Sequence, residues 1–152
     1  MLIFLAEKQA EINRPIEDVY NYVINMENFG KWFPNVIEMT SDNTLAHGEI
    51  GKKYTEQTKL PFNIKKSIPI TVIESTHNSK FVTDGDFPPL MERMTVTFSA
   101  KTIDSTLVTW KMESRNHSRL ANVFFMPIAK IIIKNRAEKG MLKLKQELEK
   151  PS

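Results

Sequence analysis

Cysteine is absent from the 152 residues of this sequence, and glycine and histidine are scarce, with five and three copies. The lack of cysteine excludes disulfide bonds, thiol catalysis and cysteine-ligated metals. No nucleophile elbow, phosphate-cradling loop or dinucleotide fingerprint is present, which argues against nucleotide-dependent chemistry. His47, His77 and His117 fall in predicted turns or strand ends, without the spacing that would bring them together with acidic residues. We therefore expect neither a metal nor a cofactor.

The sequence also has no large excess of charge of one sign, since it contains 21 basic and 18 acidic residues and its net charge is +3. Without a basic run or interleaved basic and aromatic residues, a nucleic-acid partner is not expected. The opening apolar run, residues 1–5, is shorter than a signal peptide or a membrane span. We expect a cytoplasmic protein without stable membrane insertion. The length predicts one domain, residues 1–152, and leaves the oligomeric state open.

The C-terminal stretch from Ser118 to Lys150 has the spacing of a long helix with an early break. Gly140 lies on its apolar stripe, which indicates a point where the helix backbone approaches another surface closely. Pro127 should either kink the helix or begin its main part, leaving residues 119–126 as a short separate piece. The first half of the stretch carries more apolar surface than one contact can cover, from Leu120, Phe124, Phe125, Ile128, Ile131 and Ile132.

The first strand is expected between Leu2 and Ile12, and its apolar side is built from small residues, so this strand is expected to border a space. Two short helices should follow Pro15, the second of them ending near Pro34. Six further extended runs are separated by turn residues: Val36 to Ser41, Ile50 to Thr58, Ile64 to Glu74, Lys80 to Asp84, Leu90 to Ala100 and Ser105 to Ser114. This order predicts an α+β domain with an antiparallel sheet.

Two segments carry a family resemblance. Residues 10–20 hold a strand end, a proline and the pair Val19-Tyr20, and residues 26–34 form an aromatic-rich helix that ends at Trp32-Phe33-Pro34. Together with the strand that ends at Trp110 and the long helix after it, they resemble the START-like superfamily, also called SRPBCC. This superfamily includes the birch pollen allergen, lipid-transfer domains and the bacterial polyketide cyclase/dehydrase group, to which this chain is most similar. The resemblance implies the helix-grip fold, a curved seven-stranded antiparallel sheet wrapped around the C-terminal helix, with a cavity between them.

The resemblance also directs attention to residues that would reach such a cavity. Strand alternation gives three polar candidates for catalysis, Tyr54, Glu56 and Arg93, although cross-strand surface pairs are the commoner use of Glu56 and Arg93. The expected ligand-binding residues are mainly aromatic, as in most apolar pockets, and most aromatic residues will simply fill the core. They are Trp32, Phe33, Tyr54, Phe87, Phe98, Trp110, Phe124 and Ile128.

Three functions are compatible with these features. The first hypothesis is that the protein binds a hydrophobic small molecule between the sheet and the C-terminal helix. The molecule would be a lipid-like compound, a quinone or a polycyclic compound. The second is an enzyme of the polyketide cyclase/dehydrase type that acts on a substrate held in the same cavity. The third is a protein-interaction module, for which the only sign is a lysine-rich helix face at Lys134, Lys139, Lys143 and Lys145.

Overall fold

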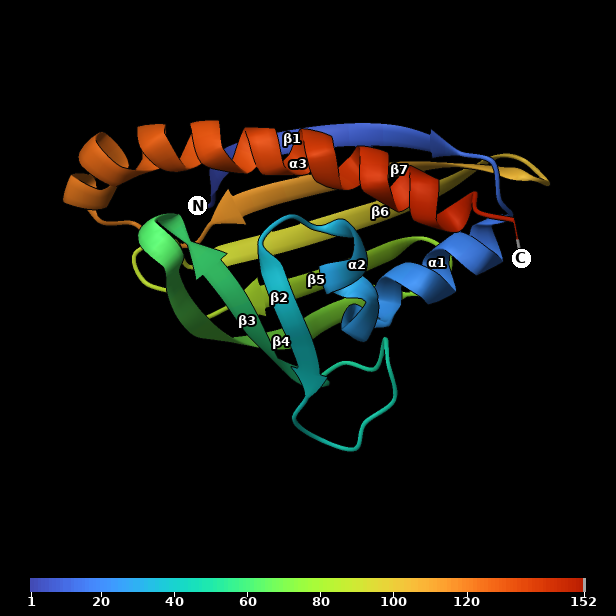
Figure 1. Ribbon diagram of the computed structural model, residues 1–152, viewed down its shortest axis with the longest axis horizontal. Coiled ribbons are helices and arrows are strands. Elements are labelled where there is room, and N and C mark those ends of the chain that lie inside the picture. Colours follow the sequence, from blue (N-terminus) through green and yellow to red (C-terminus); the bar gives the residue numbers. More distant parts are fainter. Residues whose placement is uncertain (152) are drawn as a thin grey trace.

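A curved antiparallel sheet holds one long helix against its concave face in the computed structural model, which describes residues 1–151 (Figure 1). The seven strands are β1 (Ile3–Ile12), β2 (Val36–Ser41), β3 (Lys53–Leu60), β4 (Ile64–Thr76), β5 (Lys80–Gly85), β6 (Glu92–Thr102) and β7 (Ser105–Ser114). They are arranged in the order β1-β7-β6-β5-β4-β3-β2, with every neighbouring pair antiparallel. The predicted α+β helix-grip architecture is confirmed.

Irregularities in the strand pairing bend the sheet. The register shifts between Phe4 and Ala6 in β1, between Val36 and Glu38 in β2, and at one point in each of the β4–β5 and β6–β7 pairs. An extra residue on one strand increases local twist and curvature, so these bulges let the sheet wrap around a helix. The strand bounds agree with the expected ones at β2 and β7. β3 begins three residues later than expected, because Gly51 has φ +93° and belongs to the preceding turn.

The helices are α1 (Ile16–Ile24), α2 (Phe29–Trp32) and α3 (Met126–Leu148), with 3-10 turns η1 (Met26–Asn28) and η2 (Pro61–Asn63) and a π-helical turn η3 (Ala121–Phe125). α1 and α2 are the two short helices expected after the first strand. Pro127 begins the main helix, as one of the two predicted outcomes, but the preceding segment is a wider turn that runs directly into α3. The Met126 amide donates to the Ala121 carbonyl across that turn. A π-helical turn is a rare irregularity within a helix, and here it lies just before Pro127, which has no amide hydrogen to donate.

α3 lies over the β1 end of the sheet, and α2 lies between α3 and β2, the strand at the opposite edge (Figure 1). Gly140 is the close-approach point that the sequence predicts, because a Cβ there would lie 3.1 Å from Phe33 Cδ2. Phe33 in turn stacks on Trp110 of β7, with ring centroids 5.4 Å apart. β1 borders a space of ≈ 320 Å³, but this space is an open hollow at the surface between β1 and α3, which Ala10 and Met141 line. Ala6 is buried, and α3 packs directly on this strand.

Candidate functional site

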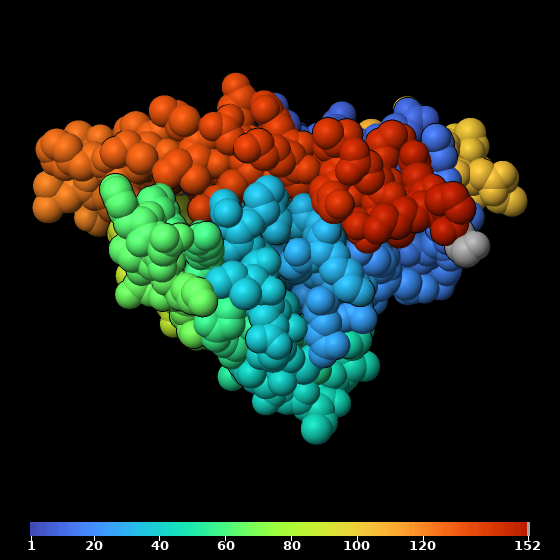
Figure 2. All heavy atoms as spheres, in the orientation of Figure 1, coloured from blue at the N-terminus to red at the C-terminus, as the bar shows by residue number. Residues whose placement is uncertain are grey.

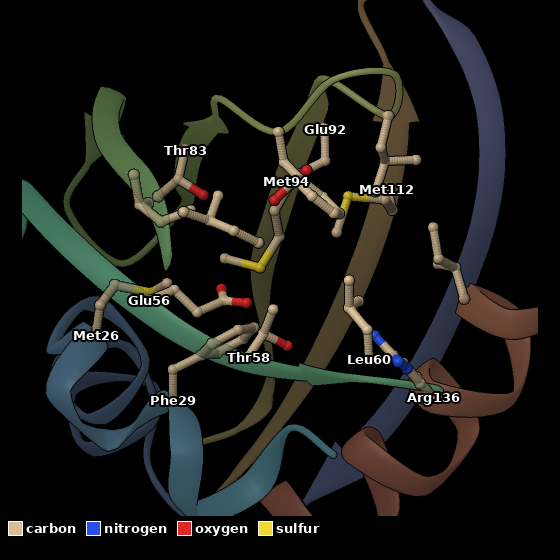
Figure 3. Close-up of a pocket in the computed structure, with 15 residues that line it drawn as sticks. Met26, Phe29, Glu56, Thr58, Leu60, Thr83, Glu92, Met94, Met112 and Arg136 are labelled. Carbon is tan, nitrogen blue, oxygen red and sulfur yellow. The ribbon is translucent and has the colours of Figure 1, made fainter. Parts of the chain in front are cut away.

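A cavity lies on the concave face of the sheet, beside the stacked aromatic rings, since its lining residue Phe29 stacks on Phe33 with ring centroids 4.8 Å apart. Its volume is ≈ 70 Å³. The lining residues come from η1, α2, five strands, the β5–β6 loop and α3 (Figure 3). They are Met26, Phe29, Glu56, Thr58, Leu60, Ile68, Ile70, Thr83, Phe87, Leu90, Glu92, Met94, Met112, Ile133 and Arg136. The cavity therefore has an apolar wall into which a few polar groups project.

Strand alternation explains which polar groups point inward. Tyr54, Glu56 and Thr58 of β3 are all buried, with the intervening residues more exposed. On β6 the inward positions are Glu92 and Met94, and Figure 3 shows the carboxyl groups of Glu56 and Glu92 turned toward the same space. Because side chains on a strand alternate between faces, two residues from different strands meet here through the curvature of the sheet. The result is a pair of buried carboxyl groups in one cavity.

Glu56 is the more strongly perturbed carboxyl group. Burial, and to a smaller extent the nearby Glu92, raise its pKa to about 8. The positive charge of Arg136 acts against both effects. A carboxyl group removed from water favours its neutral form, because the charged form loses its hydration. Glu56 is therefore largely protonated at neutral pH and can donate a hydrogen bond.

Glu92 is the second buried carboxyl group, and burial raises its pKa to about 7. Arg115 lowers this pKa, whereas Asp86 and Asp84 raise it. Within residues 1–151, Glu92 Oε2 has no hydrogen-bond partner although it is fully shielded from solvent. An unpartnered buried polar atom is costly, so this oxygen is available to a ligand or water in the cavity.

Arg136 projects from α3 toward the same cavity (Figure 3). It is half-buried, and burial lowers its pKa while Glu56 raises it. Among residues 1–151 no carboxylate oxygen lies within 4.0 Å of its guanidinium nitrogens. This arrangement leaves a cation at the edge of an apolar space, without a close anionic partner.

An open groove adjoins the cavity and has a volume of ≈ 250 Å³. Its lining residues are almost entirely apolar and come from η2 with the end of β3, the β5–β6 loop and the start of the C-terminal helix. They are Leu60, Pro61, Phe87, Pro89, Leu90, Phe125, Ile128, Ala129, Ile132, Ile133 and Arg136. Five of these residues also line the cavity, namely Leu60, Phe87, Leu90, Ile133 and Arg136. Arg136 thus stands where the two spaces meet.

The structure brings some of the predicted ligand-binding residues to this site. Phe87 lines both spaces, and Ile128 lines the groove. Four others are buried in the core and line neither space: Trp32, Phe33, Phe98 and Trp110. Phe124 also lines neither space and is 70% exposed. The apolar lining seen here therefore comes more from aliphatic residues and methionine than from the predicted aromatic residues.

The three predicted catalytic candidates are separated. Only Glu56 lines the cavity. Tyr54 is buried on the same face but its hydroxyl pairs with His47 Nδ1 at 2.6 Å, and burial raises its pKa to about 12. Arg93 lies on the opposite face of β6 from Glu92, where its Nε bonds to Asp84 Oδ1 at 2.7 Å. A role for Arg93 inside the cavity is therefore wrong, because neighbouring residues of a strand point to opposite faces.

Arg136 was not among the residues singled out from the sequence. The signal was present, since Arg136 follows Ile133 by three positions and precedes Gly140 by four, which places it beside the buried stripe of the helix. Glu92 was also not among the predicted residues, although it precedes Met94 by two positions and therefore lies on the buried face of β6, which Arg93 does not. Within residues 1–151, no three His, Asp or Glu side chains lie close enough to hold a metal ion. None of the helices in that range is both long and apolar enough to span a bilayer.

Comparison with known proteins agrees with this architecture. The family model described as polyketide cyclase/dehydrase and lipid transport matches residues 4–149, and the chain belongs to that family. No curated protein matches the sequence closely enough to count as a relative.

Solved structures show the same fold at low sequence identity. A START superfamily protein from Mycobacterium smegmatis has a TM-score of 0.76 at 15% identity, over 95% of this chain and 96% of that one. The protein TTHA0849 from Thermus thermophilus has a TM-score of 0.73 at 12% identity, over 94% and 95%. The di-domain ARO/CYC StfQ from the steffimycin biosynthetic pathway has a TM-score of 0.70 at 13% identity. The alignment to StfQ covers 94% of this chain and 49% of StfQ, so this chain spans about half its length.

Proposed function

We propose that the protein binds a hydrophobic small molecule whose apolar body lies in the groove and whose polar group reaches the cavity. The observation that supports this most directly is the shared boundary of the two spaces, an open apolar groove that leads to Arg136, Glu56 and Glu92. Ligand sites are usually apolar with a few convergent polar groups. The family description, which names both polyketide chemistry and lipid transport, is compatible with such a ligand.

The dimensions of the two spaces select the kind of ligand. The cavity, ≈ 70 Å³, holds only a few water-sized groups, whereas pockets for drug-sized ligands measure roughly 300–1,000 Å³. The groove, ≈ 250 Å³, supplies the missing space. A ligand that fits both has a small polar head and a narrow apolar body, such as an acyl chain or a small quinone. A large polycyclic molecule does not fit inside the cavity alone.

The polar groups favour an anionic head. Arg136 has no carboxylate within salt-bridge distance among residues 1–151, and Glu56 carries a proton at neutral pH because burial raises its pKa to about 8. A ligand carboxylate would accept hydrogen bonds from both groups. We therefore infer that an amphipathic carboxylic acid binds more tightly than the alcohol or amine of the same chain length.

A thermal-shift titration with decanoic acid, decanol, decylamine and a naphthoquinone tests the proposal, since a ligand that binds only the folded state raises the melting temperature. The matched variants are Ile128→Glu, which puts a charge in the groove, and Ile131→Glu, which puts the same charge one turn away outside it. Both residues are exposed, so both variants should fold. We expect Ile128→Glu to abolish the rise in melting temperature and Ile131→Glu to leave it unchanged. Absence of a shift with all four compounds, or equal loss in both variants, contradicts the proposal.

A cyclase/dehydrase-type enzyme is the second candidate, and the two buried carboxyl groups favour it. Burial raises the pKa of both groups into the neutral range, to about 8 for Glu56 and about 7 for Glu92, so the pair can hold one proton near neutral pH. The carboxylate of Glu92 would remove a proton from a carbon next to a carbonyl, while the acid form of Glu56 gives its proton to the leaving hydroxyl group. The products are water and a carbon–carbon double bond. This is the distribution of protons that acid–base catalysis requires.

The enzymatic alternative is tested with β-hydroxy ketone substrates, by measuring enone formation against pH. Replacement by glutamine, in Glu56→Gln or Glu92→Gln, should remove turnover while leaving the thermal shift with decanol in place. Turnover that survives both substitutions excludes these carboxyl groups as acid and base. Ligand binding without turnover of any such substrate supports the binding function alone.

A further inference from the structure

The start of the C-terminal helix exposes an unusual amount of apolar surface. Phe124 is 70% exposed and Ile131 is 65% exposed, whereas residues of this kind are commonly buried. The exposed large apolar side chains between positions 120 and 132 are Leu120, Val123, Phe124, Ile128, Ile131 and Ile132. In Figure 1 this part of the helix extends beyond the strands, so the sheet does not cover it.

A second apolar group lies beside it, on the turn between β3 and β4. Phe62 is 95% exposed, and its φ of 65° is in the left-handed region, which is rare for a bulky residue. Ile64 is 48% exposed. The start of the helix overhangs this hairpin in Figure 2, and the groove runs between them, since Leu60 and Pro61 line it together with Ile128 and Ile132. The mouth of the groove is therefore surrounded by exposed apolar side chains.

The β3–β4 hairpin and the start of the helix carry only positive charge, while the β5–β6 loop on the other side of the groove adds one exposed acid, Asp86. Residues 57–73 and 114–137 contain no aspartate or glutamate. The exposed basic residues of these two segments are Lys59, Lys65, Lys66, Arg119, Lys130 and Lys134. None of them forms an ion pair within residues 1–151, although ten ion pairs involve other residues. Lys59 also stands directly opposite Lys65 in the β3–β4 pair, an arrangement that destabilises a sheet unless an anion lies nearby.

We propose that this basic and apolar end, formed by the β3–β4 hairpin and residues 119–134, docks on an anionic lipid surface with the mouth of the groove against the bilayer. Apolar side chains bordered by lysine and arginine are typical of segments that lie in the membrane interface. Anionic lipids neutralise the unpaired cations, and the acyl region accepts Phe62 and the exposed isoleucines. The contact is peripheral and is additional to the proposed ligand binding.

The charge distribution also argues against a second copy of the chain as the occupant. A two-fold dimer through this surface would place six exposed cations opposite the same six, without an acid on either segment. Such an interface suffers like-charge repulsion as well as the loss of hydration around each ammonium group. An anionic surface instead turns each of these charges into an attraction.

Vesicle flotation tests the proposal directly. Vesicles of pure phosphatidylcholine are compared with vesicles in which roughly one-third of the lipid is phosphatidylglycerol, at low salt and at about 0.5 M salt. The protein should float only with the anionic vesicles, and the salt should release it. The double variant Lys65→Gln/Lys66→Gln should lower the partition coefficient about twentyfold. Phe62→Ser and Ile131→Ser should each lower it about tenfold.

Matched controls exist at the opposite end of the sheet, where Ile103 is 87% exposed in the β6–β7 turn and Lys101 lies beside it (Figure 1). Ile103→Ser and Lys101→Gln should leave flotation unchanged. None of the substituted residues lines the cavity or the groove, so ligand binding is retained and the two proposals are tested separately. Flotation that is absent, equal on both vesicle types, or equally reduced by the control variants overturns the proposal. The proposal is also overturned if the protein binds no vesicles and instead forms a dimer that the substitution Ile131→Ser dissociates.

Discussion

The carboxyl group of Glu92 lies against the backbone of Gly85, with so little space that a Cβ on Gly85 would be 2.3 Å from Glu92 Oε1 and 2.6 Å from its Cδ. Gly85 is the last residue of β5, and its carbonyl accepts a bond of 2.6 Å from Arg115. The lack of a side chain at Gly85 therefore creates the space in which a buried carboxyl group of the candidate site is placed.

Gly85→Ala should destabilise the protein by roughly 1–3 kcal/mol, because the added methyl group overlaps the carboxyl group of Glu92 in a packed region. The backbone at Gly85 is not in the positive-φ region, so alanine adds no strain of its own. Urea denaturation gives the change in unfolding free energy. In a Glu92→Ala background the same substitution should cost much less. An equal cost in both backgrounds would show that Glu92 is not the group that is displaced.

The stability of the protein should fall as the pH rises from about 5 to 9. Glu56 has a pKa of about 8 in the folded protein and 4.5 ordinarily, and Glu92 shifts in the same direction to about 7. Between these values the folded state binds more protons than the unfolded state, so raising the pH favours unfolding, by a few kcal/mol in total. Glu56→Gln removes much of this dependence. Urea denaturation at a series of pH values measures the slope.

Glu138→Gln is the control for this pH series. Glu138 is exposed and pairs with Lys8, and that pairing lowers its pKa. Its titration therefore lies below the measured range, and its removal should leave the slope between pH 5 and 9 unchanged. A wild-type protein that becomes more stable over this range would contradict the assignment of raised pKa values to Glu56 and Glu92.

Arg136→Gln should raise the pKa of Glu56 above that of the wild type, because the positive charge that favours the carboxylate is lost. It should also remove the preference for decanoic acid over decanol. Arg136→Lys keeps the charge and should retain part of both effects. Carbon NMR of the Glu56 carboxyl group follows the pKa, and calorimetry gives the two affinities. Lys134→Gln is the control, because Lys134 is exposed and lies outside both spaces. If it changed the pKa of Glu56 and the ligand preference as much as Arg136→Gln does, the effect would come from the net charge of the protein.

The sequence predicts which face of a strand a residue occupies much better than which part of that face stays open. Met94, Val96 and Phe98 alternate with polar residues and are buried as that pattern indicates. Alternation does not reveal how far along the strands the helices reach. Phe33 packs against Gly140 and stacks on Trp110, so these rings fill part of the concave face and leave open only the part that forms the cavity.

The charged groups of the site show a related limit. Glu92 lies two residues before Met94, so strand alternation places Glu92 rather than Arg93 on the buried face, but it does not show that this part of the face is a cavity. Arg136 belongs to a helix whose lysines are mostly exposed, and composition does not distinguish it from them. Its importance depends on where the groove ends, which is a tertiary relationship.

Gly140→Ala tests the packing of α3 against α2. Alanine favours a helix over glycine by about 1 kcal/mol, which alone predicts a more stable protein. The new Cβ would lie 3.1 Å from Phe33 Cδ2 and 3.4 Å from Pro34 Cδ, and Phe33 cannot retreat easily because it stacks on Trp110. We expect the overlap to cancel the propensity gain, so that urea denaturation shows no stabilisation or a small loss. Asn135→Ala, on the exposed side of the same helix, should stabilise the protein by a few tenths of a kcal/mol. A clear gain from Gly140→Ala would mean that α2 moves freely against α3, so this contact would not fix the position of α2, whose Phe29 lines the cavity.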